Sequence, residues 1–266
     1  MNKKIVLGLG MCIVLLMTFF AGCTTTQTTE LDPTLQRIKD AGKLVVGTNA
    51  EFAPWEFVNE TTGEFEGLDI DVANEIARYL SEKLGATIEV EIENMAFDEE
   101  LFAESLNNSE VDIVIAALTI NTERGKIMSF SNSYYSEGQT IIVNDSVEDI
   151  SGPTDLATKT VGAQNGTTGY YEALNYANIT IPYDTPQLAL DALLAGEIDA
   201  IVIDSRAGED LIEDVSGVKI VGQPFTEEFY GIAIKKGETA LKEEVDKAIA
   251  DLKSSGKMEE IENKWL

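Results

Sequence analysis

Four places in the sequence carry groups suited to holding the charged ends of a small molecule. Arg124 has a planar guanidinium, which suits a carboxylate because it can donate two parallel hydrogen bonds. Thr119 lies just before it and can add a hydroxyl and a backbone N–H. The run 166–168, Gly-Thr-Thr, begins a predicted helix, whose free N–H groups and dipole favour an anion. Asp204 follows a predicted buried strand and suits an ammonium group.

Each of these residues also has an interpretation that involves no ligand. Taken alone, Arg124 is more often a solvated surface side chain, and Asp204 is nearly as well explained as a helix N-cap before Ser205. The sequence contains no His, and its two Cys are both within the first 23 residues. Ser/His and Cys/His nucleophile pairs and imidazole metal sites are therefore excluded, and no cofactor and no metal is expected.

The charge of the chain excludes nucleic acid as a partner. The 266 residues include 47 Asp and Glu against 19 Lys and Arg, which gives a net charge of −28. Binding to phosphates requires an excess of Lys and Arg instead. A hydrophobic content of 44% is typical of a globular protein, and the length allows one large or two smaller domains.

The first 22 residues predict a targeting signal. Two Lys near the start precede an apolar run over 5–20, and small residues stand directly before Cys23. The ending resembles a lipoprotein signal, in which Cys23 is lipidated and becomes the mature N-terminus; the alternative is an uncleaved helical anchor. Both interpretations place the rest of the chain outside the cytoplasm. The Thr-rich residues 23–36 predict a flexible tether.

The body of the chain alternates predicted strands and helices. The first series is a strand at 44–47, a helix at 69–84, a strand at 87–93 and a strand at 111–118. The second series is a strand at 160–163, helices at 167–177 and 186–194, and a strand at 200–203. This order predicts an α/β protein with mainly parallel sheets.

One pattern occurs twice. Residues 106–115 and 193–202 each give a helix end, a tight turn, Glu, Val or Ile, Asp, and then a buried strand. The repeat predicts two similar lobes, although Glu-x-Asp before a strand is also common turn chemistry. Because ligands of open α/β sheets bind outside the carboxyl ends of strands, two such lobes would face each other across a cleft near Thr119 and Asp204.

Four motifs then occur in the order and spacing of one protein family. They are NAEFAPWEF at 49–57, GLDIDVA at 67–73, ALTINTER at 117–124 and FSNSYY at 130–135. Together they strongly resemble the polar amino-acid-binding proteins of ABC importers, solute-binding protein family 3, from about residue 43 to the C-terminus. The resemblance implies the type II fold of periplasmic binding proteins, with two similar lobes of mainly parallel sheets joined by a two-strand hinge near 135–138 and 228–231.

The resemblance also implies an organisation and a function. Lobe 1 would comprise residues 37–139 and 231–266, and lobe 2 residues 140–230. The protein would capture a polar L-amino acid outside the cell and deliver it to an ABC transporter permease, without being an enzyme. It would be a monomer held by lipid on the outer face of the cell membrane, or in the periplasm. Two alternatives remain, an enzyme similar to cyclohexadienyl dehydratases on the same scaffold and a ligand-sensing module.

By resemblance, the polar residues divide between the two charged ends of an amino acid. The ligand carboxylate would bind Arg124, Thr119 and the helix start at Thr167 and Thr168. The ammonium would bind Asp204 and the backbone carbonyl of Ala117. Because a closed cleft strips water from both charges, each needs such a partner.

Four further residues would face the ligand side chain, namely Asn49, Glu51, Phe52 and Phe97. Phe52 and Phe97 would sandwich an aliphatic stem or a planar group. Many relatives have Asp where this chain has Asn49, so a charge that a basic ligand would use is missing. Glu51 would restore part of that charge only if its side chain points inward.

Overall fold

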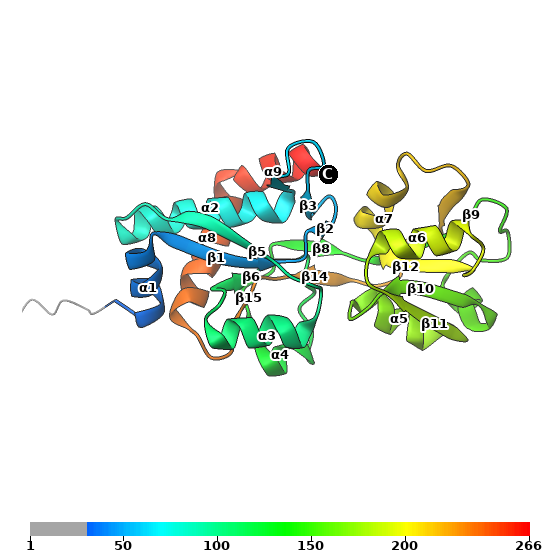
Figure 1. Cartoon of the computed structure of the whole chain (residues 1–266), viewed down its shortest axis with the longest axis horizontal. Helices are drawn as coiled ribbons and strands as arrows, with labels where there is room; N and C mark the ends of the chain where they lie inside the picture. Colours follow the sequence, from blue (N-terminus) through cyan, green and yellow to red (C-terminus); the bar gives the residue numbers. More distant parts are fainter. Residues whose placement is uncertain (1–30) are drawn as a thin grey trace, which may run out of the picture. The chain divides into compact units, whose positions relative to one another are not determined.

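Two five-stranded sheets organise the chain, which a computed structural model describes over residues 31–266 (Figure 1). Residues 32–266 form one compact unit. The predicted signal peptide 1–22 and the predicted lipid site Cys23 lie outside the described residues. Within the described part, no helix is long and apolar enough to cross a membrane.

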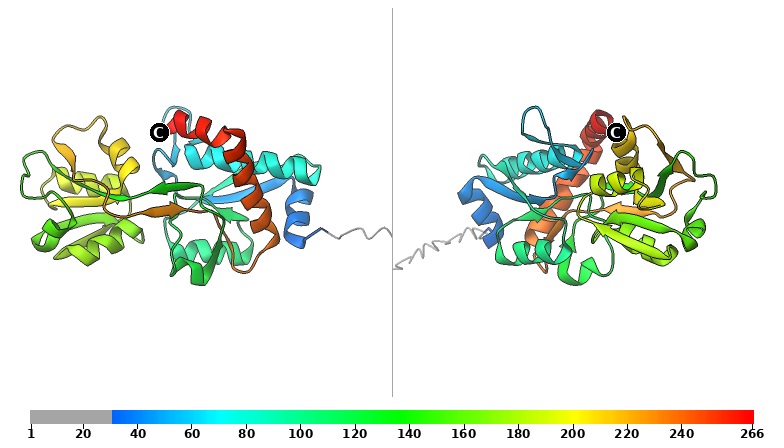
Figure 2. Two further views of the ribbon diagram at one scale, coloured as in Figure 1. Left: turned by 180° about the vertical axis from the view of Figure 1, so that it is seen from behind. Right: turned by 45° about the vertical axis from the view of Figure 1, so that its right-hand side comes forward.

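The first sheet has the strand order β5-β1-β6-β15-β7. Its strands are β1 (Lys43–Thr48), β5 (Glu89–Asn94), β6 (Ile113–Val114), β7 (Met128–Phe130) and β15 (Ala233–Lys235). The helices of this lobe are α1 (Pro33–Ala41), α2 (Leu68–Leu84), α3 (Glu99–Asn108), α4 (Arg124–Ile127), α8 (Ala240–Ser255) and α9 (Lys257–Trp265). A small sheet of β2 (Glu51–Phe52), β3 (Glu56–Val58) and β4 (Phe65–Glu66) adjoins α2. Figure 2 shows α8 and α9, in orange and red, packed against α2.

The second sheet repeats this order as β11-β10-β12-β9-β13. Its strands are β9 (Gln139–Asn144), β10 (Thr160–Gln164), β11 (Ile179–Tyr183), β12 (Ala200–Asp204) and β13 (Val218–Val221). Its helices are the short 3₁₀ helix η1 (Pro153–Thr158), α5 (Thr168–Tyr176), α6 (Pro186–Leu194) and α7 (Ser205–Ile212). In both sheets four of the five strands run in one direction, and only the fourth strand of the order, β15 or β9, is antiparallel to its two neighbours. The predicted α/β class with two similar lobes is therefore confirmed.

The repeated Glu-x-Asp pattern does the same work in both lobes. Asp112 accepts a hydrogen bond from the backbone N–H of Val45 at 2.8 Å, and its own N–H donates to the carbonyl of Val45. Asp199 makes the equivalent pair of bonds with Thr160, also at 2.8 Å from the Thr160 N–H. In each lobe this Asp fastens the start of one strand, β6 or β12, to its parallel neighbour, β1 or β10. The Glu-x-Asp pattern is therefore both a turn motif and a structural repeat, because its Asp makes the same hydrogen bonds in both lobes.

Two expected elements differ in length. The strand predicted over 111–118 is reduced to β6, because the chain turns at Ala117, whose φ of 44° lies in the left-handed region. Residues 33–36, expected in the tether, form the first turn of α1. Asp32 is its N-cap and accepts from the N–H of Thr34 at 2.8 Å, and Pro33 occupies the first helical position.

Two short strands cross between the sheets. They are β8 (Tyr135–Glu137) and β14 (Glu228–Tyr230), which pair antiparallel and coincide with the predicted hinge segments (Figure 1). The buried Trp55 packs edge-on against Tyr135 and Tyr230, with ring centroids 4.6 and 5.1 Å away. The predicted lobe limits, 37–139 with 231–266 and 140–230, stay a prediction.

Candidate functional site

A small cavity lies where the two lobes meet. Its lining comprises Phe52, Phe97, Ala116, Ala117, Thr119, Arg124, Gln164, Thr167, Thr168 and Asp204. All of the predicted ligand residues except Asn49 and Glu51 are in this lining. The cavity measures about 10 Å³, roughly the space that one water molecule needs. The polar groups around it therefore bond largely to one another.

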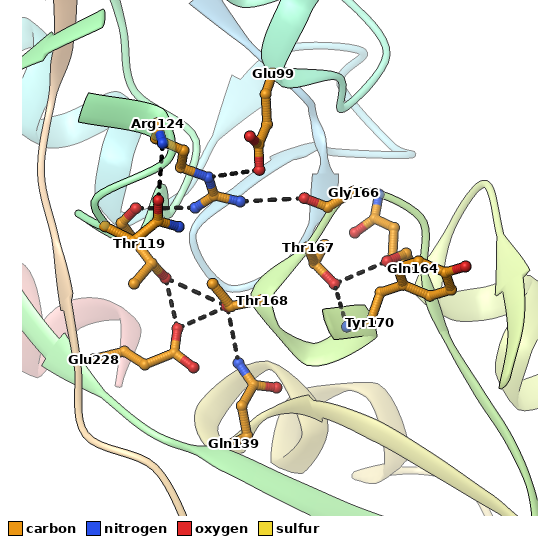
Figure 3. A network of polar contacts seen from close by, with 11 residues as sticks. Glu99, Thr119, Arg124, Gln139, Gln164, Gly166, Thr167, Thr168, Tyr170 and Glu228 are labelled. Carbon is orange, nitrogen blue, oxygen red and sulfur yellow. Dashed lines mark hydrogen bonds and ion pairs between the residues drawn. The ribbon is translucent and has the colours of Figure 1, made fainter. Parts of the chain in front are cut away.

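Arg124 is a buried cation shared by both lobes. Its side chain is only 1% exposed, so the solvated-surface interpretation does not apply. Nε donates to Oε1 of Glu99 at 2.9 Å, and Nη1 donates to the carbonyl of Thr119 at 3.0 Å (Figure 3). Nη2 reaches across to the carbonyl of Gly166 in the other lobe at 3.2 Å. The ring of Phe97 lies 5.7 Å from the guanidinium carbon, near enough for a cation–π contact.

Two hydroxyls, one from each lobe, converge beside the guanidinium. Thr119 Oγ1 and Thr168 Oγ1 lie 3.5 Å apart (Figure 3). Both donate to Oε2 of Glu228, at 2.6 and 2.7 Å. Glu228 is buried on β14 and was missed by the sequence analysis. Its place in a crossing strand beside the buried Tyr230 was a signal that could have identified it.

Asp204 ends β12 and is a buried acid. It occupies the N-cap position of α7, but its side chain makes no capping hydrogen bond. Instead it accepts from the hydroxyl of Tyr230 at 2.5 Å and from the amide of Gln139. Burial, reinforced by the nearby charge of Glu228, raises the pKa of Asp204 to about 8. The carboxyl therefore carries its proton at neutral pH.

The start of α5 contributes the anion-binding end of a helix. Thr167 is the N-cap: its Oγ1 accepts from the N–H of Tyr170 at 3.1 Å and donates to the carbonyl of Gln164 at 2.8 Å. Thr168 is the first helical residue, and both threonines line the cavity. Because the first N–H groups of a helix lack intrahelical acceptors, this end of α5 favours negative charge.

A second buried acid, Asp69, shapes the segment that carries Thr119. Its Oδ2 accepts from the N–H of Ala117 at 2.7 Å and from the hydroxyl of Tyr134 at 2.9 Å. The buried carboxyl of Glu56 lies near the same Asp69 side chain, close enough for each to affect the pKa of the other. Burial raises the pKa of Glu56 well above its usual range and that of Asp69 to about 6. Asp69 thus holds Ala117 in its turned conformation, a role that the GLDIDVA motif alone did not reveal.

The two remaining predicted residues lie apart from the cavity lining. Asn49 is buried; its amide donates to the carbonyl of Met95 at 3.1 Å and accepts from Gln164 of the other lobe at 3.2 Å. Glu51 is exposed and lines a separate open groove of about 440 Å³, together with Asp210. The inward orientation that would let Glu51 replace a missing charge is not found.

The arrangement suits binding of opposite charges more than bond-making chemistry. A guanidinium, a helix start and two hydroxyls can hold an anion, and a carboxyl can hold a cation. Phe52 and Phe97 add apolar walls. Among residues 31–266, no group of three or more Asp, Glu, His or Cys side chains is placed to hold a metal ion.

Comparison with known proteins gives concordant matches. Residues 44–266 match the model of the bacterial extracellular solute-binding proteins, family 3. The ABC transporter glutamine-binding protein GlnH of Bacillus subtilis (strain 168) is 32% identical over 240 residues, covering 88% of this chain and 84% of GlnH. A mutant of ArgBP from T. maritima has a similar structure, with a TM-score of 0.80 and 35% identity, covering 87% of this chain and 98% of ArgBP. The ancestral amino acid-binding protein AncCDT-1, a precursor of cyclohexadienyl dehydratase, gives a TM-score of 0.77 and 31% identity, covering 87% and 99%.

The raised pKa of Asp204 can be measured directly. Carbon-13 NMR of the side-chain carboxyl, assigned with Asp204→Asn, should show a titration midpoint near pH 8. Tyr230→Phe should move the midpoint higher, because the Tyr230 hydroxyl donates to the ionised form and so favours it. A midpoint close to the ordinary value of 3.8 in the parent protein would contradict this electrostatic description.

Proposed function

The chain belongs to the bacterial extracellular solute-binding proteins of family 3, and from this we propose that it captures a free polar L-amino acid outside the cell and delivers it to the permease of an ABC importer. Relatives support the proposal, since GlnH is a glutamine-binding protein of an ABC transporter and ArgBP has an arginine-bound structure. The observation that carries it is a single cavity lined by a buried Arg124 from one lobe and a buried Asp204 from the other.

The anionic end of the ligand is assigned to Arg124. Its guanidinium already bonds two neutral backbone carbonyls, of Thr119 and Gly166, and one carboxylate, of Glu99. A ligand carboxylate forms stronger, charge-assisted bonds than a neutral carbonyl and would replace the contact to Gly166. The start of α5 at Thr168 adds backbone N–H groups from the opposite lobe.

The cationic end of the ligand is assigned to Asp204. An ammonium within hydrogen-bond reach favours the ionised carboxylate, so Asp204 would give up its proton as the ligand binds. Tyr230 and Gln139 already donate to this carboxyl and would stabilise the resulting charge. Ala117 also lines the cavity, and its backbone carbonyl would supply a further acceptor.

Entry and release require the lobes to separate. A cavity of about 10 Å³ cannot admit an amino acid, which has several times the atoms of one water molecule. The contacts that hold the lobes together include the hydrogen bonds from Arg124 to Gly166 and from Gln164 to Asn49. Opening about β8 and β14 would break them, and a ligand that bonds both lobes would favour closure.

Side-chain recognition is assigned to Phe52, Phe97 and Asn49. The two rings line the cavity, and Asn49 lies behind it, bonded to the lining residue Gln164. Because this residue is a neutral amide, recognition here would rest on hydrogen bonds and apolar contact. Glu51 would act, if at all, from the open groove outside the cavity.

The cellular setting follows from the N-terminal sequence. We assign residues 1–22 to a lipoprotein signal peptide and Cys23 to the lipidated mature N-terminus, with the residues up to Leu31 as a tether. The folded part would then be a monomer on the outer face of the cell membrane, held there by lipid.

Binding without catalysis accounts for the site better than a dehydratase does, despite the similarity to AncCDT-1. The dehydratase chemistry acts on a ring carboxylate and needs no partner for an ammonium. Here both ends of a zwitterion find a buried partner, Arg124 and Asp204. We therefore propose that the protein is not an enzyme.

Removing either partner tests the assignment. Asp204→Asn and Arg124→Ala should each weaken binding of the preferred amino acid by about a hundredfold to several thousandfold, because one buried ligand charge then lacks compensation, at a cost of roughly 3–5 kcal/mol. Calorimetry against the twenty common L-amino acids measures this, with circular dichroism to verify folding.

The matched controls are Asp210→Asn on α7 and Arg78→Ala on α2, which make the same charge changes outside the cavity. Both should bind within twofold of the parent. If Asp204→Asn keeps its affinity within threefold, the ammonium assignment fails. If the parent binds none of the twenty amino acids, the proposed function fails.

A further inference from the structure

Glu228 accepts hydrogen bonds from two hydroxyl groups that border the site proposed for the ligand's carboxylate and could also bind it. Thr119 Oγ1 and Thr168 Oγ1 donate to the same oxygen of Glu228, at 2.6 and 2.7 Å (Figure 3). One threonine comes from each lobe, and Glu228 itself stands on the crossing strand β14. In the closed form, the Glu228 carboxylate therefore already accepts the hydrogen bonds of two hydroxyl groups that a ligand carboxylate would use.

The remaining bonds of Glu228 show that it is held by hydroxyls. Its other oxygen accepts from Thr226 Oγ1 at 3.1 Å. Among residues 31–266, its side-chain hydrogen bonds come from the three threonines alone. The side chain is 7% exposed, so its charge is poorly screened by water.

A ligand carboxylate on Arg124 would lie beside this fixed anion. Thr119 connects the two, since its carbonyl accepts from Arg124 Nη1 and its hydroxyl donates to Glu228. The ligand carboxylate and the Glu228 carboxylate would repel each other strongly, because little water is present between them to screen the charges. The ligand must also take the hydroxyls of Thr119 and Thr168 away from Glu228 before it can use them.

We propose that Glu228 is a specificity-determining residue, an internal carboxylate that competes with the ligand's carboxylate for Thr119 and Thr168 and excludes ligands that carry a second one. This inference rests on the proposed function. It names the ligand class as neutral or basic amino acids. The charged groups around the cavity agree, since Arg124 pairs with Glu99 while two further carboxyl groups, Asp204 and Glu228, lie near each other at the same site.

The neighbouring Thr226 would keep Glu228 hydrogen-bonded after a ligand has taken the hydroxyls of Thr119 and Thr168. Its hydroxyl bonds the Glu228 oxygen that the other two threonines leave unused. When a ligand takes Thr119 and Thr168, Glu228 keeps this partner on its own crossing segment. This competition lowers the affinity for the ligand, although every group that the ligand contacts is still present. When the ligand leaves, Thr119 and Thr168 bond to Glu228 again.

The test is Glu228→Gln, which removes the charge and keeps the shape. Its matched control is Glu227→Gln, the same change at the exposed neighbouring position. Calorimetry would compare three probes: the amino acid among the common twenty that the parent binds most tightly, the α-carboxamide of that amino acid, and L-glutamate.

Glu228→Gln should bind the preferred amino acid about tenfold more tightly, equivalent to about 1.4 kcal/mol. L-Glutamate should gain at least as much, and the carboxamide, which has no carboxylate, should change less than threefold. Glu227→Gln should stay within twofold of the parent for every probe.

Equal or weaker binding of the amino acid by Glu228→Gln would overturn the proposal, and weaker binding would assign Glu228 to the ammonium instead. Circular dichroism melting verifies the fold, and Glu228→Ala, expected to shift affinity in the same direction, serves if the Gln variant does not fold. If the parent protein binds none of the twenty amino acids, the proposed function is wrong. If the parent binds one of them but the Glu228 variants bind it no more tightly, only the role of Glu228 is wrong.

Discussion

The site depends on two ionisable groups of opposite sign that are buried around one cavity without being paired to each other. Arg124 is neutralised in part by Glu99 and otherwise bonds backbone carbonyls, and Asp204 avoids its charge by keeping a proton. Removing water from either charge is costly unless a partner replaces it. A zwitterionic amino acid supplies one partner for each group. Because the two groups come from different lobes, its binding stabilises the form in which the lobes are together.

The scaffold brings these groups together by repeating one lobe. In both lobes an Asp after a tight turn fastens one strand, β6 or β12, to its parallel neighbour, β1 or β10. The polar groups lie at or beyond the end of that strand, with Asp204 ending β12 and Thr119 and Arg124 following β6. The crossing strand β14 adds Glu228 and Tyr230, so a strand of the hinge contributes a charge and a hydrogen-bond donor to the site.

The fold was readable from the sequence because its signals are local. Periodic apolar faces, caps and turns gave α2, α6 and β12 within a residue or two, and the four motifs contain four of the ten residues that line the cavity. Glu228 was missed because its role depends on Thr119 and Thr168, which lie 109 and 60 residues away in the sequence. Strand alternation with Tyr230 nevertheless distinguishes it from the exposed Glu227. The shortness of β6 likewise follows from Asp69, a distant residue that turns the chain at Ala117.

In this description of the site, a ligand ammonium converts a protonated Asp204 into a carboxylate. Calorimetry of the preferred amino acid at pH 7, in buffers of different ionisation enthalpy, counts the protons released. With a pKa of about 8 before binding, close to one proton should be released, and affinity should fall up to about tenfold for each pH unit below 8. Binding at pH 7 that releases no proton, with an affinity that stays constant between pH 6 and 8, would contradict the account.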